Sequence, residues 1–127
     1  MAEKISKFRF HGYKITDSLI HIDANQEVSK GCDVTFEKTA GVNEAERKMR
    51  LLLIAKIDSH NKAMHIEVKA EGYFEFEQDI TDDEKKIFFN TSAPAILFPY
   101  VRAYIGSLTA LSGVAPVVLP TLNLSDR

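Results

Sequence analysis

The clearest pattern in the chain is the alternation of apolar and polar residues from Met64 to Glu77. Successive side chains of a β-strand point to opposite sides, so this period of two predicts a long strand with one buried and one solvated face. The preceding segment, Lys48–Asp58, is also strand-like, and the short polar connection Ser59–Lys62 contains an asparagine, which favours a hairpin turn. The two segments are therefore predicted to pair in antiparallel fashion.

Two further strands are predicted nearer the N-terminus. One is Phe8–Asp23, interrupted at Gly12, and the other is Cys32–Thr39, in which apolar and polar residues again alternate. Gly41–Ala45 is interpreted as the connection to the third strand, although Glu44–Arg50 taken alone is also compatible with a helical turn. Four strands are thus expected before any long helix.

The period changes near Asp79, where a helical region is predicted to begin. Thr81 and Glu84 have the spacing of a capping box, and the two aspartates between them lie where the helix dipole favours negative charge. A short helix is expected from there to about Phe89.

A second, longer helix is predicted from a cap at Asn90–Ser92, with Pro94 just inside, to Gly113. Pro99 falls within it and predicts a kink near its start. The chain after Gly113 contains two prolines and cannot continue the helix. The apolar stripe of this helix follows a spacing of three and four residues: Leu97, Tyr100, Val101, Tyr104, Ile105, Leu108 and Leu111.

These elements predict an α+β fold in which a four-stranded antiparallel sheet is followed by a short helix and a long amphipathic helix packed on one face. At 127 residues the chain has the length of one domain, 1–127, with strands over about 5–78, helices over about 81–113 and an extended segment over 114–127. A composition of 45% hydrophobic and 27% charged residues is that of a folded, soluble protein.

Charge and targeting features exclude several classes of partner. The formal net charge is -2 and the basic residues are scattered, which argues against a nucleic-acid partner. No signal peptide and no apolar run long enough to cross a bilayer is found, so no direct membrane insertion is expected. A single cysteine, Cys32, excludes an internal disulfide framework and fits a reducing compartment, so we expect a cytoplasmic protein.

Catalytic motifs are missing from the sequence. The glycines form no phosphate-binding loop, the four histidines stand without metal-ligand spacing, and Cys32 has no accompanying catalytic motif. We therefore expect no enzyme activity, no metal and no cofactor. Acidic residues are frequent from Glu67 to Glu84, which is compatible with a solvated face or with a docking patch for a basic partner.

The C-terminal third carries a more specific pattern. The run Ala95–Arg102 reads Ala-Ile-Leu-Phe-Pro-Tyr-Val-Arg, and it is followed by Gly-Val-Ala-Pro at 113–116 and by Pro-Thr-Leu-Asn-Leu at 120–124. In this pattern, and in the order of its four strands, the chain resembles the SecB family of protein-export chaperones.

The resemblance implies an ATP-independent holdase that binds unfolded precursor proteins in apolar grooves and assembles as a dimer of dimers, that is, a homotetramer. The groove residues expected from it are Phe36, Phe74, Phe76, Val117, Val118 and Leu119. The expected oligomer interface comprises Leu97, Tyr100, Val101, Tyr104, Ile105 and Leu108. Asp17 and Glu67 correspond to acids that dock the SecA motor, while a further expected acid aligns near His21.

One departure from the family concerns the C-terminus: SecB proteins normally carry a further helix and a flexible tail, and this sequence stops at Arg127. We therefore expect a more open groove and a less secure SecA interaction. Two alternatives stay open: a SecB-like chaperone dedicated to one client, such as an antitoxin, and a small-ligand-binding or enzymatic α+β domain.

Overall fold

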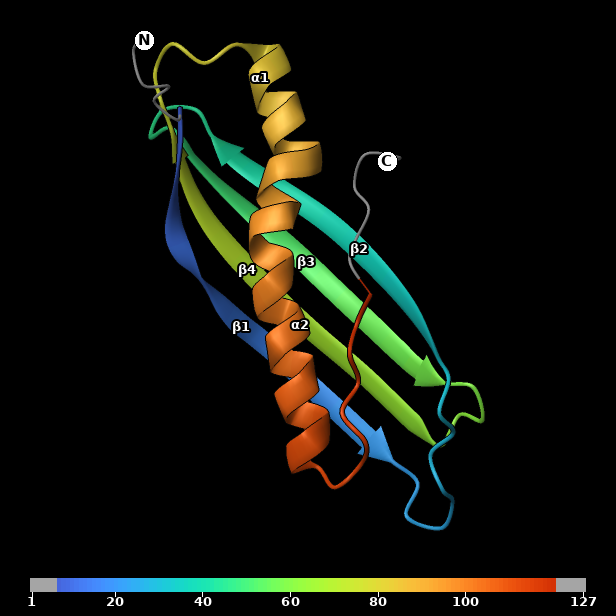
Figure 1. The fold of residues 1–127 in the computed structure, drawn as a ribbon. Helices are drawn as coiled ribbons and strands as arrows, with labels where there is room; N and C mark the ends of the chain where they lie inside the picture. The colour runs from blue at the N-terminus through green and yellow to red at the C-terminus, as the bar shows by residue number, and fades with distance from the viewer. Residues whose placement is uncertain (1–6, 121–127) are drawn as a thin grey trace, which may run out of the picture.

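The four strands form one antiparallel sheet in the order β1-β4-β3-β2, shown in Figure 1. The computed structural model describes residues 7–120. The strands are β1 Phe8–Ile22, β2 Cys32–Asn43, β3 Lys48–Ser59 and β4 Met64–Phe76. The predicted strands are confirmed, and β2 alone differs by more than one residue at an end, since it runs on through Gly41 to Asn43.

Local chemistry explains both tight turns. At the β3–β4 hairpin the buried Ser59 hydroxyl accepts a hydrogen bond from the Met64 amide at 2.9 Å, and Lys62 adopts a positive φ of 63°. Between β2 and β3 the chain turns over 44–47 and Arg47 has a φ of 55°. The alternative of a helical turn over Glu44–Arg50 is wrong, because Lys48 onward already pairs with both neighbouring strands.

The helical region is continuous from residue 82 to residue 111. It consists of α1 Asp82–Ile87, a π-helical turn η1 Phe88–Ser92, and α2 Ala93–Leu111. The capping box predicted at α1 is confirmed: Thr81 Oγ1 accepts from the Glu84 amide at 3.1 Å, and the Glu84 carboxylate accepts from the Thr81 amide at 3.0 Å. Helix α2 ends beside Gly113, whose φ of 89° suits a residue without a side chain.

The second N-cap predicted at Asn90–Ser92 is wrong, because Ser92 is itself helical and its side chain caps nothing. Pro94 provides the physical reason, since it cannot donate a hydrogen bond to the carbonyl of Asn90, four residues earlier. The chain widens there into a π-helical turn, and the Asn90 carbonyl accepts a hydrogen bond from Lys38 Nζ of β2 at 2.8 Å. The helix therefore continues where the sequence signals a start. A kink at Pro99 stays a prediction.

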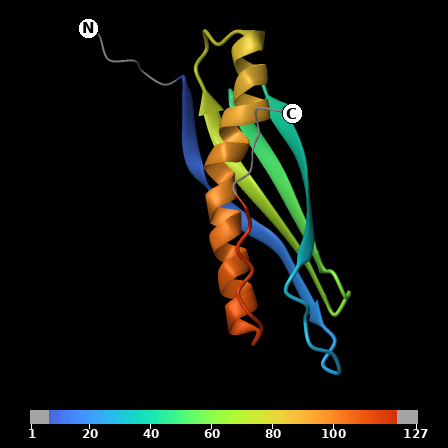
Figure 2. The same ribbon diagram turned by 45° about the vertical axis from the view of Figure 1, so that its right-hand side comes forward.

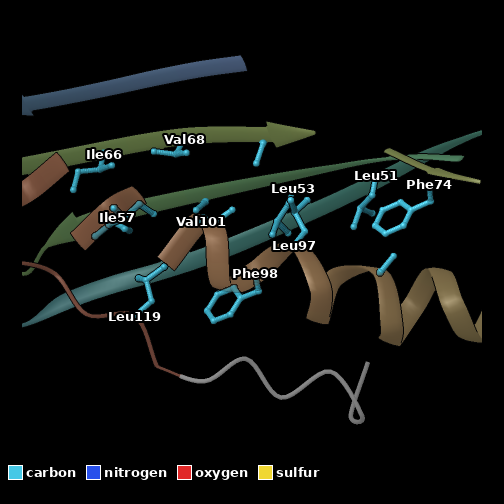
Figure 3. Packing of buried hydrophobic residues seen from close by; sticks show 14 of the residues in the cluster. Leu51, Leu53, Ile57, Ile66, Val68, Phe74, Leu97, Phe98, Val101 and Leu119 are labelled. Carbon is cyan, nitrogen blue, oxygen red and sulfur yellow. The ribbon is translucent and has the colours of Figure 1, made fainter. Parts of the chain in front are cut away.

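The core lies between α2 and the inner face of the sheet, the face that α2 covers in Figures 1 and 2. Leu97, Val101 and Ile105 of α2 are fully buried. In the close view of Figure 3, Leu97 and Val101 point at the apolar residues of β3 and β4. Gly72 of β4 leaves space mainly for the Phe74 ring, because a Cβ atom there would stand 3.2 Å from that ring and in ordinary contact, at 3.5 Å, with the methyl carbons of Leu97.

Two glycines of the edge strands allow a matched test of backbone strain. Gly12 of β1 has a φ of 110° at a register shift, whereas Gly41 of β2 pairs regularly with Arg50, and a Cβ atom would meet nothing within 4 Å at either position. We predict that Gly12→Ala lowers the free energy of unfolding by about 1–2 kcal/mol, because alanine is strained at that φ. Gly41→Ala should be neutral or slightly stabilising. Urea denaturation of both variants checks this, and equal losses would contradict the strain argument.

Candidate functional site

The segment after α2 forms one wall of the candidate site. Residues 114–120, here called the strap, leave Gly113 and run back beside α2 on the side of β2 (Figures 1 and 2). The strap is anchored to the helix at Thr109, whose hydroxyl accepts a hydrogen bond from the Val117 amide at 2.8 Å. Leu119 of the strap is completely buried although it belongs to no helix or strand. Leu119 is thus the most deeply buried contact of the strap, and Val114 and Val117 pack partly buried against the same core.

A groove with a cavity of about 280 Å³ separates the strap from β2 and the loop before it. We call this space the strap groove. Its lining is mainly apolar, and among the lining residues within 7–120 only Lys30 carries a charge. Cys32 lies half-buried in the lining, and burial, followed by the charge of Asp33, raises the pKa of its thiol. The lining residues are Val28, Ser29, Lys30, Cys32, Val34, Met64, Ala115, Pro116, Val117, Val118, Leu119 and Pro120.

Four of the six predicted groove residues lie at or beside the strap groove. Val117, Val118 and Leu119 line it directly. Phe36 follows Val34 on the same face of β2, is half-buried, and meets Phe98 of α2 edge-on with ring centroids 5.4 Å apart. Cys32, Val34 and Phe36 share one partly buried face of β2, which we call the apolar strip of β2.

The other two predicted groove residues, Phe74 and Phe76, are not brought to this place. Both are buried in the core near the opposite end of the helical region, where Phe74 meets Phe88 with ring centroids 5.2 Å apart. Sequence reasoning in turn missed Val28, Cys32, Val34 and Met64. The alternation that singled out Phe36 also contains Val34 and Cys32 and could have found them, whereas Val28 lies in a loop without a pattern.

The predicted interface stripe of α2 divides into two halves. Leu97, Val101 and Ile105 are buried against the chain's own sheet, while Tyr100, Tyr104 and Leu108 are partly exposed.

The tyrosines of that second half face β1. Tyr100 stacks on Tyr13 at 4.3 Å between ring centroids, and the Tyr104 hydroxyl donates to Ser18 Oγ at 2.8 Å. On the outer side of the helix stand the exposed residues Ala95, Pro99, Ala103 and Ser107, next to Arg102, the only charged residue of α2.

The predicted docking acids lie on the outer face of the sheet, away from α2. Asp17 pairs in register with Lys69, at 3.9 Å between charged atoms. Glu67 Oε2 lies 3.0 Å from Nε2 of His65, and His65 Nδ1 lies 2.9 Å from Asp58. His21, which stands where a third acid was expected, is the cross-strand partner of His65.

The hydrogen bond to Glu67, followed by the one to Asp58, raises the pKa of His65, and the same contact with His65 lowers the pKa of Glu67. Farther along β4, Glu71 and Glu75 also lie within 4.0 Å of basic side chains. These contacts favour a solvated, internally paired face over a strongly acidic patch.

A wider depression of about 790 Å³ lies at the end of the sheet near the β2–β3 turn. Its lining mixes both charge signs, with Arg50, His11 and Glu75 around Tyr73. Within residues 7–120 no three histidine, cysteine or acidic side chains lie close enough together to hold a metal ion. Over the same residues, none of the helices combines the length and the apolar character needed to cross a membrane.

The His65–Glu67 contact makes stability depend on pH in a defined direction. A raised pKa in the folded protein contributes stability that is complete below the ordinary histidine value of about 6.5 and disappears as the pH rises through the folded pKa. We predict that His65→Gln destabilises the protein more at about pH 6 than at about pH 9. Urea denaturation at both pH values measures how much His65→Gln lowers the free energy of unfolding. The control is Glu67→Gln, which removes the larger cause of the raised His65 pKa; in that background the loss caused by His65→Gln should depend less on pH. A pH-independent loss would contradict this assignment.

Comparisons with known proteins agree with this architecture. The SecB–like chaperone Rv1957 of Mycobacterium tuberculosis, solved in complex with a ChAD peptide from the Rv1956 HigA1 antitoxin, superposes with a TM-score of 0.78, covering 92% of this chain and 88% of that chain at 14% sequence identity. At this identity the likeness shows a shared fold.

Sequence relatives extend the likeness. The protein-export protein SecB of Orientia tsutsugamushi (strain Boryong) is 25% identical over 125 residues, which cover 98% of this chain and 77% of the relative. An uncharacterized protein of Methanocaldococcus jannaschii, MJ0357, is 27% identical over 106 residues, covering 81% of this chain and 68% of that protein.

The Leu-Asn-Leu part of the sequence pattern, at 122–124, lies outside the described residues. The family model for preprotein translocase subunit SecB nevertheless matches residues 18–126, most of the sheet and all of the helical region and strap. The chain therefore belongs to the SecB family.

Proposed function

We propose that this protein is an ATP-independent chaperone, a holdase that binds unfolded or precursor polypeptides in the cytoplasm and serves protein export. The strap groove and the apolar strip of β2 that continues it carry this proposal. Membership of the SecB family and the export role named for its relatives support it. Side-chain geometry in the described residues offers binding surface and no aligned reactive groups, so we also propose that the protein is not an enzyme.

The position of β2 at the edge of the sheet favours an extended client. Within residues 7–120 only β3 pairs with it, so its other edge has no neighbouring strand there, and the pairing with β3 is regular from Cys32 to Asn43. An extended segment can add main-chain hydrogen bonds to such an edge while placing every second side chain on the inner face. Apolar burial contributes about 25 cal/mol per Å² regardless of sequence, which suits a binder of many clients.

A second candidate is a SecB-like chaperone dedicated to one client such as an antitoxin. The outer face favours it, because Asp17 and Glu67, the proposed SecA-docking acids, are already paired within the sheet and His21 occupies the place of a third acid. The fold neighbour from Mycobacterium tuberculosis is itself bound to an antitoxin peptide. SecA thus remains a proposed partner. The alternative of a small-ligand-binding domain has the least support, because the depression at the β2–β3 turn is open and is lined by residues of both charge signs.

The chaperone proposal predicts suppression of aggregation without nucleotide. The purified protein should keep several unrelated denatured clients in solution, whereas a dedicated chaperone should protect one only. Phe36→Ser should weaken client binding on the order of tenfold, the effect of losing about 1.4 kcal/mol of apolar contact. Light scattering during dilution of the clients from denaturant measures protection.

The matched control is Thr35→Ser, an exposed neighbour on the opposite face of β2. Circular dichroism should show that both variants are folded. If neither the wild-type protein nor Thr35→Ser suppresses aggregation of the clients, the proposed function is refuted.

We also propose a homo-oligomer, a dimer of dimers that uses the outer and β1-facing sides of α2. Tyr100 is 40% exposed and small residues line the outer side, so a second copy can approach the helix closely. Leu97, Val101 and Ile105 would take part only indirectly, because the chain's own sheet covers them.

The interface is best probed at Ala103, which is exposed on the outer side of α2. Ala103→Asp should dissociate the assembly, since an unpaired charge in an apolar interface costs several kcal/mol, on the order of 3–5. Tyr104→Asp should act in the same direction but also removes the hydrogen bond to Ser18. Light-scattering mass in solution measures the state, with Thr35→Asp as the control; an unchanged mass for Ala103→Asp would contradict this interface.

A further inference from the structure

The strap has the character of a polypeptide bound to the groove. Its sequence, Val-Ala-Pro-Val-Val-Leu-Pro, carries no charge. Val117 is half-buried and Leu119 fully buried, while Val118 between them is 69% exposed. This alternation is that of an extended segment with every second side chain directed into an apolar surface.

The strap is held unevenly along its length. Near α2 it is anchored by backbone contacts to Thr109: the Val114 amide donates to the Thr109 carbonyl at 3.3 Å and the Val117 amide to the Thr109 hydroxyl at 2.8 Å. From Val118 to Pro120 the hydrogen bonds described for residues 7–120 include none made by the strap. Burial of Leu119 is therefore the contact that keeps this end on the sheet.

From these observations we propose that the strap is an internal ligand of the strap groove, and that a client binds by displacing Leu119 from the apolar surface beside Cys32 and Val34. The inference rests on the proposed function. The displaced segment indicates the class of client: an extended, uncharged stretch with apolar residues at alternating positions. A longer client contacts the strip of β2 as far as Phe36 as well, so it outcompetes the single anchoring leucine.

When the strap covers the groove, the apparent affinity for clients is lower and the protein is protected from self-association. A client that binds only the open state has an apparent Kd equal to its intrinsic Kd divided by the fraction of open molecules. If the strap is closed about 90% of the time, the apparent affinity falls on the order of tenfold. In exchange, an apolar surface that would associate between copies stays covered when no client is present.

Release of the strap can be measured without any client, because Cys32 is the only cysteine of the chain and lines the groove together with Leu119. Leu119→Ser should free the strap and speed the reaction of the Cys32 thiol with a chromogenic disulfide reagent several-fold. Thr35→Ser, on the opposite face of β2 and outside the groove lining, should react at the wild-type rate. The urea-unfolded chain gives the upper limit, and circular dichroism confirms that both variants are folded. An unchanged rate for Leu119→Ser would overturn the proposal.

Client affinity supplies the second measurement. A fluorophore-labelled, carboxymethylated and permanently unfolded polypeptide, titrated by anisotropy, should bind Leu119→Ser more tightly than it binds the wild-type protein or Thr35→Ser. Weaker or equal binding together with faster thiol reaction would show that the strap is a wall of the site and not its ligand, which overturns the inference while the chaperone function stands. If no variant binds the probe and no aggregation is suppressed, both the inference and the proposed function fail.

Discussion

The packing of α2 against the two central strands determines what the rest of the molecule can do. Leu97, Val101 and Ile105 are fully buried against the inner faces of β3 and β4, and less buried contacts of α2 with β1 and β2 flank them. A helix with side chains is about 10–12 Å wide, whereas four strands about 4.8 Å apart span a broader surface. One helix therefore cannot cover this sheet, and apolar side chains remain toward both edges.

The two edges are covered differently, and this asymmetry places the site. Toward β1 the gap is closed by large aromatic residues, where Tyr100 stacks on Tyr13 and Tyr104 bonds to Ser18. Strand β1 is also irregular, with register shifts around Gly12 and Thr16. Toward β2 the cover is the strap, which contributes one fully buried side chain. The regularly paired edge thus lies beside the weaker cover, and that combination suits an extended segment from another chain.

Much of this architecture could be predicted from sequence, because period-two alternation in β3 and β4 and the three-and-four spacing of α2 are direct consequences of burying one face. The prediction failed where a tertiary contact overrides a local signal: Asn90–Ser92 reads as a cap, but Lys38 from β2 satisfies the Asn90 carbonyl that Pro94 leaves without a donor. For the site, the alternation of apolar and polar residues does not predict which apolar residues of the sheet the helix covers. Phe36 and Phe74 have the same pattern in sequence, yet Phe36 lies on the edge strand β2 and is only partly buried, whereas Phe74 lies on the central strand β4 and is fully buried.

The two faces of the sheet also divide the chemistry between them. On the outer face the charges are balanced across neighbouring strands, as in Asp17 with Lys69 and Glu67 with His65, so a partner that docks there must displace existing contacts. On the inner face charge is nearly missing beside the strap, and Lys38, the charged residue that β2 directs inward, is occupied by the helix. Selectivity for sequence would need several placed polar groups, whereas the described lining of the strap groove is mainly apolar, with Ser29 and Lys30 as its hydroxyl and charged residues. What it can distinguish is chain that is extended and apolar from chain that is folded, and that distinction is the one a holdase requires.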